Sequence, residues 1–188
     1  MRRRAESVEA TRTRILDAVR DLFREHLDPA SITIEEAARH AGVSAMTVTR
    51  QFGTKAELMA ATQERERGRM VEMRRAPAGD VGAAVHALYD HYEEAGDWGL
   101  SMQAFEHVRP GMHEMVGRAR ASHRSWVKET FAPQLARIAG ADRDELITAL
   151  VVACDLLTWK QLRRDLDLPR RKAESIVRRM VSALIRED

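Results

Sequence analysis

Apolar residues recur with the period of an α-helix along almost the whole chain. In the first long segment, residues 8–26, they fall on one helical face, at Ile15, Leu16, Val19, Leu22 and Phe23. No segment of useful length alternates apolar and polar residues in the manner of a half-buried β-strand. The pattern therefore predicts an all-α protein.

Capping and breaking residues set the expected helix boundaries. Residues 33–36 (TIEE) and 54–57 (TKAE) each have the spacing of a capping box, and Asp28 before Pro29 ends the first helix. In the first part of the chain we expect helices over residues 8–26, 33–40, 44–52 and 54–75. Beyond them we expect helices over residues 83–96, 98–108, 111–138 with a kink at Pro133, 143–164 and 169–186.

The segment from residue 33 to residue 52 has the pattern of a helix-turn-helix. Gly42 permits a sharp turn between two short helices, and Ser44 can cap the second of them. On a helical wheel, one face of this second helix is apolar and points inward, at Ala45, Val48 and Phe52. The opposite face is small, polar or cationic, which suits entry into a DNA major groove.

Several residues around this second helix can contact DNA. Arg50 can donate two hydrogen bonds to guanine or contact a phosphate, and an ordinary surface arginine is the alternative. Lys55 would combine its charge with a helix N-terminus, which favours phosphate. The three arginines at residues 2–4 form a basic tail that can grip phosphate or simply be solvated. The candidate DNA-binding residues are Arg3, Arg4, Thr33, Ser44, Ala45, Met46, Thr47, Thr49, Arg50 and Lys55.

At this point the sequence resembles a known family. Residues 43–52 (VSAMTVTRQF) and 53–58 (GTKAEL) are similar to the recognition region of the TetR family of transcriptional regulators. The resemblance covers about residues 10–60 and implies a homodimer with an effector pocket in each C-terminal domain. Thr49 and Gln51 depart from the tyrosine and histidine that are common in the family, which puts a phosphate contact by that tyrosine in doubt.

Composition and charge are consistent with this assignment. The chain has 188 residues and a formal net charge of +2, and residues 1–55 account for the whole of that charge. Cys154 is the single cysteine, which excludes an internal disulfide and suits a reducing compartment. The apolar stretches are too short for a membrane span, and Glu6 and Glu9 stand where a secretory signal would be apolar. We therefore expect a cytoplasmic protein.

The two last expected helices carry more apolar surface than a short chain needs to cover. They could pair with their symmetry mates in a four-helix bundle, or pack on residues 83–138 within a monomer. A single helix-turn-helix reads few base pairs, which favours the dimer. The candidate dimerisation residues are Leu150, Leu157, Ile176, Val177, Met180 and Leu184.

Large side chains and neighbouring polar groups between residues 89 and 159 could line a small-molecule cavity. A packed core is the alternative interpretation for each of them. The candidate effector-binding residues are Tyr92, Trp98, Met102, Phe105, His123, Trp126, Val127 and Cys154.

An enzyme is the competing class of function. The sequence has no readable nucleophile–base set, phosphate-cradling glycine loop or paired carboxylates, and the seven histidines lack metal-ligand spacing. We therefore predict a non-enzymatic regulator without metal or cofactor, with a DNA-binding domain at residues 1–55 and an effector-binding and dimerisation domain at residues 56–188. It would be a repressor that binds a palindromic operator as a homodimer and is released by a small molecule. The alternative is control by a protein partner, or no effector at all.

Overall fold

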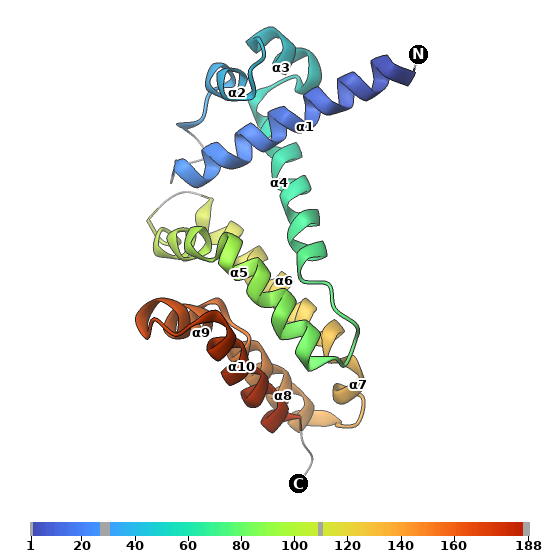
Figure 1. Ribbon diagram of the computed structural model, residues 1–188, viewed down its shortest axis with the longest axis vertical. Coiled ribbons are helices and arrows are strands. Elements are labelled where there is room, and N and C mark those ends of the chain that lie inside the picture. The colour runs from blue at the N-terminus through green and yellow to red at the C-terminus, as the bar shows by residue number, and fades with distance from the viewer. Residues whose placement is uncertain (1, 27–30, 109–110, 186–188) are drawn as a thin grey trace. The chain divides into compact units, whose positions relative to one another are not determined.

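The computed structural model describes residues 2–26, 31–108 and 111–185, and for residues 2–5 the backbone only. Within these ranges every regular element is a helix, so the predicted all-α class is confirmed (Figure 1). No helix among these residues is long and apolar enough to cross a membrane. The chain forms two compact units, residues 1–71 and 72–188.

The first unit is built on the long helix α1 (Arg2–Glu25). Figure 1 shows α2 (Ile34–Ala41) and α3 (Ala45–Phe52) beside it, and α2 packs on both α1 and α3. All five apolar residues of the predicted inner face of α1 are buried. They form one core with Ile32, Ala37, Ala38, Val48, Phe52 and Leu58.

The start of α4 (Lys55–Met73) belongs to this first unit. Leu58 and Thr62 are buried. The Arg65 guanidinium donates to the Thr13 carbonyl at 3.1 Å and pairs with Asp17 at 3.1 Å. These contacts join α4 to α1, so the first unit extends well beyond the boundary expected after residue 55, to residue 71.

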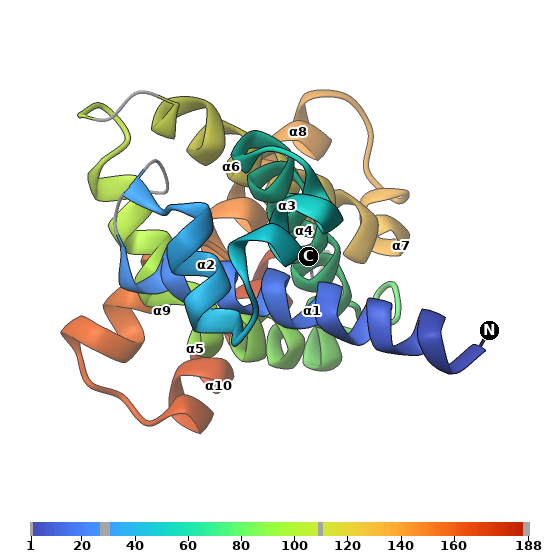
Figure 2. The ribbon, with the colours of Figure 1, turned by 90° about the horizontal axis from the view of Figure 1, so that it is seen from above.

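The second unit encloses its core with four long helices. The helix α5 (Val81–Ala104) packs on α6 (Met112–Thr130) and α10 (Arg170–Leu184), and α8 (Gly140–Ala153) packs on the same two helices. Figure 2 shows α10 beside α5. The short α7 (Ala132–Leu135), α9 (Leu156–Lys160) and the π-helix η2 (Gln161–Asp165) connect them. The core includes Val85, Leu88 and Tyr89 of α5, Trp126 and Val127 of α6, Ile147 and Leu150 of α8, and Val177 and Val181 of α10.

The expected break at Gly96 is wrong, because α5 runs through it as one helix. A Cβ atom at Gly96 would lie 2.6 Å from the Trp159 ring, and Trp159 is fully buried. This glycine therefore makes room for the packing of α9 on α5, and it does not end the helix.

Three further boundaries differ from expectation. The segment 143–164 is divided at Cys154, and the Asp155 carboxylate accepts from the Leu157 N–H at 2.8 Å to cap α9. The segment 111–138 breaks at Phe131, because Pro133 occupies the first turn of α7, where proline is tolerated. The expected basic tail is helical, since α1 begins at Arg2.

Candidate nucleic-acid interface

The turn between α2 and α3 is fixed by its own hydrogen bonds. The Thr33 hydroxyl caps α2 by accepting from the Glu36 N–H at 3.1 Å. The helix ends at Gly42, whose φ of +66° lies in the left-handed region that glycine adopts without steric cost. The Val43 N–H then donates back to the Ala38 carbonyl at 2.9 Å. The chain thus leaves α2 in a defined direction.

The helix α3 has the two faces that the sequence predicted. The Ser44 hydroxyl caps it by accepting from the Thr47 N–H at 3.2 Å. Val48 is 1% exposed and faces the core, whereas Met46 is 78% exposed. Arg50 is exposed as well. A capped helix with one buried face therefore presents its remaining side chains outward on a fixed frame.

Arg12 of α1 holds the C-terminal end of α3, a role that the sequence analysis missed. Its guanidinium donates to the Gln51 carbonyl at 3.3 Å and lies over the Phe52 ring, 4.3 Å from the ring centroid. A cation at a helix C-terminus and over an aromatic face is favourable on both counts. The position of Arg12 in the sequence could have indicated this role, because Arg12 lies three residues before Ile15 and so on the inner side of α1.

The start of α4 follows α3 after a single tight turn. The Glu57 carboxylate accepts from the backbone N–H of Thr54 at 2.7 Å and from its hydroxyl at 2.8 Å. The Thr54 hydroxyl accepts in return from the Glu57 N–H at 3.2 Å, which completes the predicted capping box. Donation from the Thr54 backbone lowers the pKa of Glu57, with a smaller effect from the hydroxyl. Lys55 lies in the first turn, partly buried.

The predicted DNA-binding residues within residues 33–55 all keep some exposure. Thr33, Ser44 and Thr49 are exposed, like Met46 and Arg50, and Ala45 and Thr47 are partly exposed. The hydroxyls of Thr33 and Ser44 are helix caps, which fixes where each oxygen lies. Arg3 and Arg4 belong to the first turn of α1, but their side chains lie outside the described residues.

The predicted effector-binding residues fall into two groups in the second unit. In the main core, the Tyr92 hydroxyl donates to the Cys154 carbonyl at 3.0 Å, and the rings of His123 and Trp126 stack at 5.7 Å. Val127 is buried in the same core. Trp98, Met102 and Phe105 belong instead to a small separate cluster with Met112 and Val116.

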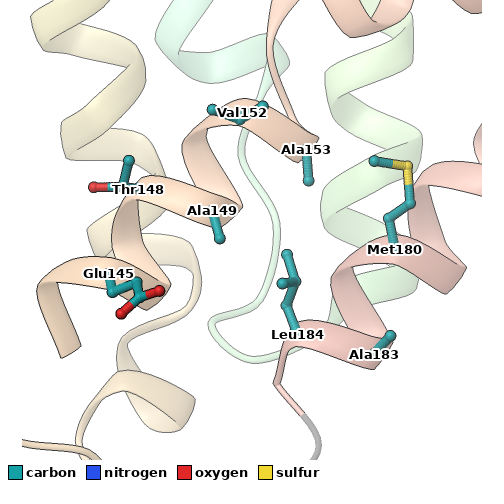
Figure 3. Close-up of a pocket in the computed structure, with 8 residues that line it drawn as sticks. All are labelled: Glu145, Thr148, Ala149, Val152, Ala153, Met180, Ala183 and Leu184. Atoms are coloured by element: carbon teal, nitrogen blue, oxygen red, sulfur yellow. The ribbon is translucent and has the colours of Figure 1, made fainter. Parts of the chain in front are cut away.

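The predicted dimerisation residues also divide by burial. Leu150 and Val177 are buried in the core of their own chain, which removes them from any surface. Ile176 is partly buried, and Leu157, Met180 and Leu184 are exposed. Met180 and Leu184 line a groove between α8 and α10 that Figure 3 shows, together with Glu145, Thr148, Ala149, Val152, Ala153 and Ala183.

Comparison with known proteins identifies the first unit. Residues 15–62 match the family model described as bacterial regulatory proteins, tetR family, whose members are non-enzymatic DNA-binding proteins. No curated protein matches the chain. The match spans α1 from its first buried residue through α2, α3 and the buried start of α4. Residues 15–62 are therefore a TetR-family N-terminal helix-turn-helix domain, the DNA-binding domain of transcriptional regulators.

Proposed function

We propose that the protein is a repressor that binds a palindromic operator as a homodimer and leaves it when a small molecule binds the second unit. The observation that carries this proposal is the geometry of α3. Its inner face is locked by Val48 and Phe52, its two ends are held by Ser44 and Arg12, and its outer face is exposed. A rigid helix of this kind can dock in a major groove with one orientation.

In the proposed complex, α3 lies in the major groove with Arg50 directed at base edges. Met46 and the methyl groups of Thr47 and Thr49 would contact thymine methyl groups. Thr33, Ser44 and Ala45 would lie near the backbone at the edge of the groove. Lys55 and the basic residues Arg3 and Arg4 would contact phosphates.

The proposed dimer uses the groove between α8 and α10. Its lining is mostly apolar, with Ala149 and Leu184 directed toward the space between the two helices (Figure 3). A second copy would bring the same two helices and form a four-helix bundle around a two-fold axis. The symmetry of such a dimer is the reason why the operator should be palindromic.

The proposed effector would act through α4. This helix starts with the capping box next to α3 and extends to Met73, two residues into the second unit. A ligand that shifts the end of α4 would change the spacing of the two recognition helices in the dimer. Strong release requires that the ligand prefer the released state by roughly 10⁴-fold.

Control by a protein partner, or the lack of any effector, is the second candidate. It is favoured by the burial of Tyr92, Met102, His123, Trp126, Val127 and Cys154. Neither the groove between α8 and α10 nor the hollow beside His86 and Arg170 includes them. Under this alternative, no small molecule changes the affinity of the protein for its operator.

Selection of bound duplexes from a random DNA pool tests the proposal. The selected sequences should share a palindrome whose half-sites are about one helical turn apart. The variant Arg50→Ala should bind with a loss of about 1–3 kcal/mol and accept any base at one position of each half-site. Arg118→Ala, an exposed arginine of α6, is the matched control and should select the wild-type sequence. Selected sites without symmetry would contradict the dimeric mode of binding.

A further inference from the structure

A buried arginine lies among the residues that the sequence analysis assigned to the effector. Arg74 directly follows α4 and is only 7% exposed. One partner of its guanidinium is the neutral hydroxyl of Ser122 on α6, at 3.2 Å. Its backbone carbonyl accepts from the Trp126 indole N–H at 2.9 Å. The second unit thus holds a guanidinium cation inside its core, next to α6.

His123, the residue after Ser122, has one ring nitrogen with an unmet hydrogen bond. The side chain is 8% exposed, and Nε2 lies 3.2 Å from the Val151 carbonyl. A carbonyl only accepts, so Nε2 carries the hydrogen, and Nδ1 of the neutral ring is then an acceptor. Nδ1 is buried and has no hydrogen-bond partner within the part of the chain that the structure describes. A buried acceptor in this state favours any ligand that can donate to it.

Burial favours the neutral form of His123. It lowers the pKa of the imidazole, and the positive charge of Arg74 acts in the same direction, while the Val151 carbonyl and the charge of Asp155 oppose the shift. The Asp155 carboxylate is at the same time the cap of α9. The site therefore offers a cation at Arg74 and a neutral acceptor at His123, beside the stacked Trp126 ring.

We propose that the second unit binds a small hydroxylated carboxylate, with the carboxylate on Arg74 and the hydroxyl donating to Nδ1 of His123. A guanidinium recognises a carboxylate through paired, charge-assisted hydrogen bonds, and their attraction is strengthened in a buried site. The Trp126 ring would form an apolar wall for the carbon skeleton of the ligand. This inference rests on the proposed function, in which the second unit is the effector domain.

The position of Arg74 also supplies the link to DNA. It is the first residue after Met73, the end of α4. The side chains of the cluster are packed together, so a ligand has to part Arg74 from Ser122 to reach the guanidinium. That displacement moves the backbone at the end of α4, which is the motion that the proposed release requires.

Thermal unfolding of the full chain with a matched series of probes tests the ligand class. The probes are the hydroxybenzoates, the hydroxybenzamides, which lack the charge, and benzoate, which lacks the hydroxyl. We expect at least one hydroxybenzoate to raise the melting temperature, with the matching amide and benzoate binding at least tenfold more weakly. Arg74→Met should abolish the effect, and Arg74→Lys should weaken it. Arg75→Met, at the exposed neighbour that pairs with Glu72, should leave it unchanged.

His123→Phe gives an independent readout, because it should remove the preference for the hydroxybenzoate over benzoate while binding of the carboxylate persists. The proposal fails if no hydroxybenzoate binds, if the amide binds as well as the acid, or if folded Arg74→Lys and Arg74→Met bind like the wild type.

Operator binding, measured in parallel, separates the two proposals. A ligand that binds without changing operator affinity supports the ligand class and contradicts ligand-controlled release. Palindromic operator binding without any ligand effect leaves the DNA-binding function intact and contradicts the ligand class.

Discussion

Lys55 is the residue for which a phosphate contact can be measured most directly. It lies in the first turn of α4, where the amides of the helix N-terminus add to its charge. Lys55→Ala should weaken binding to all duplexes alike and reduce the slope of log affinity against log salt concentration by about one. Titrations over a range of salt concentrations measure this slope. Lys128→Ala, at an exposed lysine of α6, is the control, and a slope equal to the wild type in Lys55→Ala would exclude the contact.

The buried imidazole of His123 makes stability depend on pH. Its pKa is lowered in the folded protein, mainly by burial, so the unfolded chain binds more protons as the pH falls below the ordinary value of about 6.5. The stabilisation is thus fully present above that value and is lost as the pH falls toward the folded-state pKa. Urea unfolding between about pH 7.5 and pH 5.5 should show this loss.

His123→Phe supplies the comparison for that measurement, because phenylalanine can stack on Trp126 without titrating. The variant should lose less stability than the wild type over the same pH interval. The carboxyl groups with lowered pKa values, such as Glu93, Glu106 and Glu174, contribute at lower pH and do not enter this interval. An equal pH dependence in the two proteins would contradict the assignment.

Prediction from sequence worked at the residues whose roles are local. The inward position of Val48 and the caps at Thr33, Ser44 and Thr54 depend on neighbours within a few positions along the chain. Arg12 and Arg74 were missed because their partners, Gln51 and Ser122, are distant in sequence. From the sequence alone, an isolated arginine in a helical pattern is assigned to the surface, because its distant partners are known only from the fold.

The helices illustrate the same distinction between local and tertiary causes. Eight-residue helices with clear caps, α2 and α3, were placed to within one or two residues. Gly96 was taken for a helix end because a glycine near the end of an apolar stripe usually is one. Its actual role depends on Trp159, which lies 63 residues later and packs where a side chain would otherwise be.

The turn from α3 to α4 depends on Gly53. Its φ of +79° and ψ of −105° are unfavourable for other residues, and a Cβ there would clash with Glu57 Oε2. Moving Glu57 away would break the capping box with Thr54. Gly53→Ala should therefore lower the free energy of unfolding by more than about 1 kcal/mol, as measured by urea denaturation.

Gly68→Ala is the matched control for that substitution. Gly68 lies within α4, and an added Cβ would meet no atom within 4 Å. Alanine is the better helix former, so this variant should gain about 0.5–1 kcal/mol. If Gly53→Ala were as stable as Gly68→Ala, the backbone at residue 53 would not be the determinant of the turn.

At the scale of the whole molecule, the apolar residues predicted for the last two long helices divide into a buried group and an exposed group. The sequence could not separate them, because Leu150 and Val177 lie in the same stripes as Leu157, Met180 and Leu184. The structure assigns the first pair to the core of the chain and leaves the other three exposed. The surface proposed for the dimer is accordingly narrower than the predicted one, and Val152 joins it as an exposed apolar residue that the sequence analysis had not included.

Charge placed in this groove should separate the two copies. Met180→Glu with Leu184→Glu would bring four carboxylates together across the two-fold axis, in an apolar interface where unpaired charge is costly. Sedimentation should then show a monomer, and operator affinity should fall steeply because one helix-turn-helix reads a half-site alone. Leu166→Glu changes an exposed leucine outside the groove and should stay dimeric. If the double variant remained a dimer with unchanged operator affinity, the second copy would have to bind at another surface. The two recognition helices would then be related by a different two-fold axis, and the proposed effect of Arg74 on them through α4 would have to act about that axis.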